Sequence, residues 1–201
     1  MLEPKQNPTP QLFVDPPAWF RLIISRLMLG PQASESRLES RRRKAEQRRK
    51  QAGAPHVVDY FHQLDDPYSH LAIQVIEQFA DLYDIKLNVH LIRATGGNSQ
   101  PEFEKLAVWA RRDAEWIAPH YQLSFPSHAG KTPSPEHQVL AGRALLAYAN
   151  GEQDVDLATV SEALWAGDDA TLNEYATISA SAEDVLRALD SGWALLQERK
   201  D

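Results

Sequence analysis

Residues 66–69 (DPYS) bring together two side chains that could do acid–base chemistry. In a desolvated pocket, the Asp66 carboxylate would act as a general base toward a substrate, and Ser69 offers a hydroxyl a few residues further on. His62 and His70 flank this segment, and a histidine is the side chain that most readily exchanges a proton near neutral pH. The sequence therefore predicts catalytic roles for Asp66 and Ser69, with the histidines beside the ligand.

The same residues also have a purely structural interpretation. An aspartate followed by a proline is a common helix start, because the carboxylate caps free backbone N–H groups and Pro67 suits the first helical position. Tyr68 would then pack against the protein or line a pocket. The sequence leaves open whether Asp66 is a cap, a base or both.

A strand–helix–strand unit is predicted to position this turn. Residues 57–61 are β-branched and aromatic, apolar residues recur at helical spacing over 67–82, and 85–91 alternate apolar and polar side chains. A unit of this length, 56–92, is typical of a βαβ motif. It places the turn at the N-terminus of the predicted helix, where free N–H groups favour an anion or a thiolate.

Two segments in this order carry a family resemblance. Residues 66–69 resemble the SPYS-type active-site turn of kappa-class glutathione transferases and 2-hydroxychromene-2-carboxylate isomerases, which belong to the DsbA-like branch of the thioredoxin fold. Residues 96–101 (GGNSQP) resemble the G-N-x-P segment with which those proteins hold glutathione. The resemblance implies a glutathione-dependent isomerase or transferase that acts on a small organic substrate. The ligand-binding residues would be Pro67, Tyr68, Asn98, His70 and His62.

One substitution in the turn opposes this activity. Where those enzymes have a serine that hydrogen-bonds the glutathione sulfur, this chain has Asp66. At roughly 4 Å and an effective dielectric constant near ~20, a carboxylate repels a thiolate by about 4 kcal/mol. Either Ser69 supplies the hydroxyl or Asp66 acts as the base; alternatively, the domain is a non-catalytic binding or assembly module. The chain has no cysteine, which excludes a dithiol/disulfide oxidoreductase mechanism.

The rest of the globular part, 54–201, is predicted to be helical. Helices are expected over 102–121, 136–149, 156–166, 172–179 and 183–196. They resemble the helical insertion of DsbA-like proteins, here 100–201. The second half that the resemblance implies, with a cis-proline loop and two antiparallel strands, does not follow, so we expect a truncated or split member. The predicted fold is a mostly helical α/β domain whose open sheet edge is covered by 19–29, by a second copy in a homodimer or by a partner protein.

An N-terminal arm, 1–53, precedes this domain. It has a proline-rich lead, an amphipathic helix over 19–29 and a basic helix over 35–51. Residues 1–53 carry a net charge of +6, and 54–201 carry −13. We expect a solvated arm or one docked on an acidic partner, with peripheral membrane contact through 19–50 as the alternative. Because no aromatic side chain is interleaved with the basic residues, no nucleic-acid partner is expected.

Composition sets the remaining expectations. No apolar run approaches the roughly 20 residues that a membrane span needs, and no secretory signal pattern is recognisable at the N-terminus. Cytoplasmic residence is therefore expected. His120, His128 and His137 lack the spacing of metal ligands, so no metal site is predicted.

Overall fold

The computed structural model describes residues 34–94, 102–126, 131–152, 154–176 and 180–199. Contacts within the chain divide it into two units, Met1–His56 and Val57–Asp201. None of the helices in the described ranges has the length and apolar composition that a membrane span requires. The second unit is a mostly helical α/β domain with a small parallel sheet.

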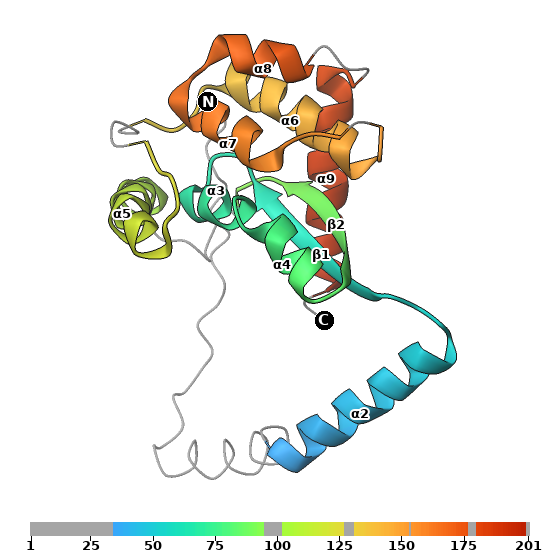
Figure 1. Cartoon of the computed structure of the whole chain (residues 1–201). Helices are drawn as coiled ribbons and strands as arrows, with labels where there is room; N and C mark the ends of the chain where they lie inside the picture. The colour runs from blue at the N-terminus through green and yellow to red at the C-terminus, as the bar shows by residue number, and fades with distance from the viewer. Residues whose placement is uncertain (1–33, 95–101, 127–130, 153, 177–179, 200–201) are drawn as a thin grey trace, which may run out of the picture. The chain divides into compact units, whose positions relative to one another are not determined.

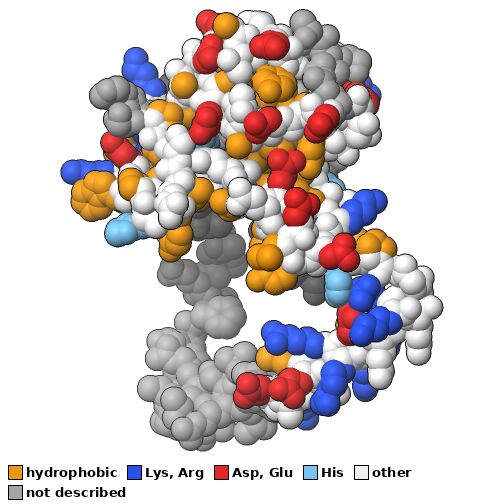
Figure 2. Space-filling view, in the orientation of Figure 1, with side chains coloured by type: hydrophobic (Ala, Val, Ile, Leu, Met, Phe, Trp, Pro, Cys, Tyr) orange, Lys and Arg blue, Asp and Glu red, His pale blue; other side chains and the backbone are white. Residues whose placement is uncertain are grey.

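The first unit contains the basic helix that the sequence predicted, α2 (Glu35–Gln51), in which no residue is buried. Lysine and arginine side chains line it in Figure 2. Glu46 accepts hydrogen bonds from Arg49 Nε (2.9 Å) and Nη2 (2.7 Å). The hydrogen bond from Arg49 lowers the pKa of Glu46 to about 2. The helix is thus stabilised by pairs one turn apart rather than by an apolar face.

The predicted strand–helix–strand order is present at the start of the second unit. Strands β1 (His56–Gln63) and β2 (Ile85–Ile92) form a two-stranded parallel sheet. Side chains alternate across it: Tyr60 and Leu91 join the core, whereas Asp59 on the other face accepts hydrogen bonds from Asn88 and His90. Side chains therefore link the two strands on both faces of the sheet.

The connection between the strands differs from the prediction of one helix over 67–82. It contains two short helices, α3 (Pro67–Ile73) and α4 (Ile76–Leu82), as Figure 1 shows. The break lies at Gln74 and Val75, where Val75 has φ −121° and its N–H donates to the Ala72 carbonyl oxygen at 3.1 Å. Gln74 Nε2 donates to the carbonyl oxygens of His70 (3.1 Å) and Ser124 (2.8 Å). The Ser124 N–H also donates to Gln74 Oε1 at 2.8 Å, so a distant loop holds the break.

Three helices build the main hydrophobic core. Helices α6 (Pro135–Ala149), α7 (Leu157–Ala166) and α8 (Asp169–Ala176) pack against one another in the upper part of Figure 1. Their bounds agree with the predicted helices to within a few residues. The fully buried side chains of these helices include Leu145, Leu157, Val160, Leu164 and Leu172.

Helix α9 (Ala182–Glu198) packs along β2, together with α6. A capping box between Ser181 and Asp184 begins this helix. Just beyond its end, Arg199 Nη2 reaches Asp59 Oδ2 on β1 at 2.9 Å. The sequence assigned this segment to a helical insertion, but here it covers the sheet itself. The predicted cover over 19–29 lies outside the described residues.

Helix α5 (Phe103–Ile117) continues into the short 3-10 helix η1 (Ala118–Tyr121) and lies beside α3 in Figure 1. Leu71 of α3 packs against Ala114 and Ala118 in a second, smaller core cluster. Because both alanines are fully buried, α5 comes close to the helix that begins at the predicted active-site turn.

Candidate functional site

The packing of α5 on α3 leaves a cavity of about 520 Å³ beside the predicted active-site turn. This volume lies in the range of small-molecule binding sites. Three of the predicted site residues, Asp66, Pro67 and Tyr68, line the cavity together with Gln63 and Asp65. The opposite wall belongs to α5 and is formed by Leu106, Ala107, Trp109, Ala110 and Asp113.

Asp66 and Ser69 are hydrogen-bonded to each other. Asp66 Oδ2 accepts the Ser69 backbone N–H at 2.7 Å and the Ser69 hydroxyl at 2.8 Å. This is the helix cap of the structural interpretation, with Pro67 in the first turn of α3. The Ser69 hydroxyl proton is used within the cap, and Ser69 does not line the cavity.

His62 and His70 are core residues, contrary to the prediction that they bind the ligand. Their side chains are 1% and 0% exposed, and neither lines the cavity. Burial lowers the pKa of His62 to about 3 and that of His70 to about 4, so both are neutral at physiological pH.

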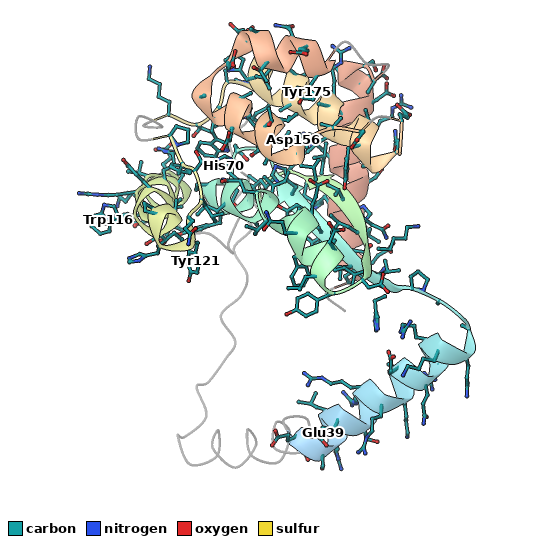
Figure 3. The ribbon with its side chains drawn as sticks, viewed as in Figure 1. Glu39, His70, Trp116, Tyr121, Asp156 and Tyr175 are labelled. Atoms are coloured by element: carbon teal, nitrogen blue, oxygen red, sulfur yellow. The ribbon has the colours of Figure 1, made fainter. Side chains whose placement is uncertain are left out.

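Both buried histidines are hydrogen-bonded. The partners of His70 are distant in the sequence, and the partner of His62 lies on the same strand. His70 Nδ1 lies 2.7 Å from Ser161 Oγ of α7, and its Nε2 lies 3.1 Å from the Ser124 carbonyl oxygen. Figure 3 shows His70 between α3 and the helices above it. His62 Nδ1 lies 3.0 Å from the Tyr60 hydroxyl. These bonds compensate the burial of the imidazoles and join α3 to α7.

Three carboxylates make the cavity acidic: Asp65, Asp66 and Asp113. Gln63 Nε2 donates to Asp65 at 2.9 Å, and the Tyr68 hydroxyl donates to Asp113 Oδ2 at 2.7 Å. Burial and this bond to Asp113 raise the pKa of Tyr68 to about 12. In the part of the chain that the structure describes, lysines, arginines and histidines pair with other carboxylates, namely Glu46, Asp59, Glu102, Asp169, Asp184 and Asp190.

The α5 wall of the cavity also carries exposed aromatic side chains. Trp109 is 63% exposed, and Trp116, which points away from the globule in Figure 3, is 65% exposed. The Arg112 guanidinium lies 5.7 Å from the Trp109 ring centroid and 5.6 Å from that of Trp116. The sequence did not lead to a prediction that α5 lines the site. Leu106, Ala110 and Asp113 recur at helical spacing, which indicates that they share one face of this helix.

Asn98, the remaining predicted ligand residue, lies outside the described residues. Across the described ranges, no group of three or more His, Asp or Glu side chains could hold a metal ion. No protein-family model matches the chain, and no curated protein or solved structure matches it.

Proposed function

We propose that residues 57–201 form a ligand-binding domain with a thioredoxin-like βαβ unit, in which the former active-site turn serves as a helix cap. The order of strand, turn, helices and parallel strand supports this lineage, as does the resemblance of residues 66–69 and 96–101 to the DsbA-like turn and glutathione segment. The observation that carries the proposal is the bond between the Ser69 hydroxyl and Asp66 Oδ2. It uses the Ser69 hydroxyl and one carboxylate oxygen of Asp66 in the cap.

The electrostatics of the turn support binding without activation of a thiol. A thiolate beside Asp66 would also face Asp65 and Asp113, which line the same cavity. Repulsion from one carboxylate at roughly 4 Å is about 4 kcal/mol, whereas one hydrogen bond to a charged group contributes roughly 1.5–3 kcal/mol. Helix α3 has only 7 residues and already has the Asp66 carboxylate at its N-terminus, so its dipole offers little compensation.

A second candidate is the glutathione-dependent isomerase or transferase. It is favoured by the position of the cavity, which opens at the turn where the resembling enzymes hold the glutathione sulfur. In that mechanism, Asp66 would take the proton of the thiol or of a small organic substrate. Asn98 would hold glutathione through its amide.

Replacing Asp66 by serine distinguishes the two candidates. The wild-type chain is expected to leave the thiol pKa of glutathione unchanged, as measured by the ultraviolet absorbance of the thiolate during a pH titration. Asp66→Ser is expected to bind glutathione at least ~10-fold more tightly than wild type in calorimetry, because one repelling carboxylate is removed. Serine is as good an N-cap as aspartate, so α3 is retained.

Asp66→Asn is the matched control for this substitution. It caps the helix and removes the charge, but it adds no hydroxyl, so it separates repulsion from hydrogen bonding to sulfur. Wild-type protein that binds glutathione and lowers its thiol pKa would replace the binding-domain proposal with the enzyme. Failure of both variants to bind glutathione would remove the support for a thioredoxin-like lineage.

A further inference from the structure

We infer that the cavity between α3 and α5 binds an organic cation, an ammonium or guanidinium group attached to an apolar or aromatic body. This inference rests on the proposed function, because it names the chemical class of the ligand that the cavity takes. It is drawn from the charge of the cavity, the aromatic side chains at its rim and the contacts that hold its walls.

The charge of the cavity favours a cation. The carboxylates of Asp65, Asp66 and Asp113 all line it, and each accepts its described side-chain hydrogen bonds from neutral groups only. A carboxylate has about four lone-pair sites, so each retains acceptor capacity for a ligand. Among the described residues that line the cavity, none is a lysine or an arginine. A cation that enters the cavity therefore gains charge-assisted hydrogen bonds, and an anion is repelled.

Basic side chains on α5 do not neutralise these carboxylates. Lys105 pairs with Glu102 at 3.0 Å, and Arg111 Nη1 donates to the Thr132 hydroxyl at 3.1 Å. Arg112 lies over the two tryptophan rings. The basic groups of the helix that forms one wall thus have contacts of their own, so the cavity remains acidic.

The apolar part of the lining suits the body of such a ligand. Pro67, Leu106, Ala107 and Ala110 supply aliphatic surface, and Leu106 is 48% exposed. Tyr68 and Trp109 are 42% and 63% exposed. The Arg112 guanidinium lies over the Trp109 ring, so a ligand cation would use the Tyr68 ring or the remaining exposed surface of Trp109. An aromatic face attracts a cation through its quadrupole, most strongly for tryptophan. Carboxylates beside exposed aromatic rings are a combination that recognises amines.

The two walls of the cavity are held together. The Tyr68 hydroxyl, on the α3 side, donates to Asp113 on α5, and Leu71 packs against Ala114 and Ala118. A ligand therefore meets a largely formed site and has less ordering cost to overcome.

Three probes that share a phenethyl group test the inference on the full chain. They are phenethylammonium, the neutral phenethyl alcohol and the anionic 3-phenylpropanoate, and binding is followed by protein-observed NMR titration. We expect the ammonium to bind at least ~10-fold more tightly than the alcohol and the carboxylate not to bind detectably. Added salt should weaken the binding of the ammonium and leave that of the alcohol unchanged.

Substitutions then locate the site. Asp113→Asn is expected to lower the affinity for phenethylammonium at least ~5-fold, since the amide oxygen still accepts the Tyr68 hydroxyl but the charge is lost. Trp109→Ala should have a similar effect. Glu115→Gln is the matched control: it removes one negative charge from the same helix, outside the cavity lining, and is expected to leave the affinity unchanged.

The outcomes separate this inference from the proposed function. If ammonium and alcohol bind equally at the resonances of the lining residues, the cavity is a binding site but its selectivity for cations is refuted. If none of the three probes binds to the folded protein, or if Glu115→Gln weakens binding as much as Asp113→Asn, the inference is also overturned. Activation of the glutathione thiol by wild-type protein would instead refute the proposed function.

Discussion

Acidification from about pH 7.5 to about pH 5 is expected to lower the free energy of unfolding of residues 57–201 by about 4 kcal/mol. His62 and His70 are buried, with pKa values of about 3 and about 4 in the folded protein. In the unfolded chain, both take up a proton near pH ~6.5. Stability is therefore fully present above that pH and is lost as the pH falls, by at most about 1.4 kcal/mol per pH unit for each histidine.

Urea titrations followed by circular dichroism at several pH values would measure this dependence. His70→Gln should remove about half of it, because one of the two titrating groups is gone and the amide can still bond Ser161. His120→Ala, at an exposed position, should leave the dependence unchanged. Aspartates with lowered pKa values, such as Asp59 and Asp156, destabilise the fold only at lower pH. A flat profile between pH 7.5 and 5 would contradict the burial of neutral imidazoles.

Gly192→Ala is expected to destabilise the domain by about 3 kcal/mol. A Cβ atom at this position would lie 2.1 Å from the Leu91 carbonyl oxygen and 3.1 Å from its carbonyl carbon. Both are backbone atoms of β2, so the contact is relieved only if α9 moves away from the strand. Alanine gains about 1 kcal/mol of helix propensity over glycine, and the overlap outweighs this gain. Chemical denaturation with tryptophan fluorescence provides the measurement.

Gly142→Ala is the control for this substitution. Its Cβ would lie 2.7 Å from Val185 Cγ1, so the overlap is smaller than at Gly192 and involves a side-chain atom rather than the backbone of a strand. The cost should therefore be at least ~1 kcal/mol smaller than at Gly192. Equal stability of Gly192→Ala and wild type would show that α9 does not pack on β2 as closely as described.

Much of the fold and part of the site could be predicted from the sequence. Local sequence patterns predicted the strands around residues 57–61 and 85–91 and the helices of the second half. Such elements depend on periodicity and capping within a few residues. The helix start at Asp66 was also predictable, since its capping partner Ser69 is only three residues away. The sequence thus located the turn that lines one wall of the cavity.

The errors concern side chains whose partners are distant in the chain. The turn histidines were expected beside a ligand, but His70 bonds Ser161, 91 residues away, inside the core. At the break after α3, the Gln74 side chain bonds Ser124, which lies 50 residues further along the chain. No local pattern contains either contact. Periodicity therefore predicted a longer helix, and the position of the histidines beside the turn led to the expectation that they contact a ligand.

By itself, the sequence determined the order of strands and helices, the cap at Asp66 and the acidic charge of residues 54–201, because each depends on composition or on neighbours along the chain. Only the tertiary structure decided that Asp113 and Trp109 face this cap, that His62 and His70 are buried and that α9 covers β2. These features arise when helices bury their apolar faces against one another, and that packing brings together residues that no spacing in the sequence relates.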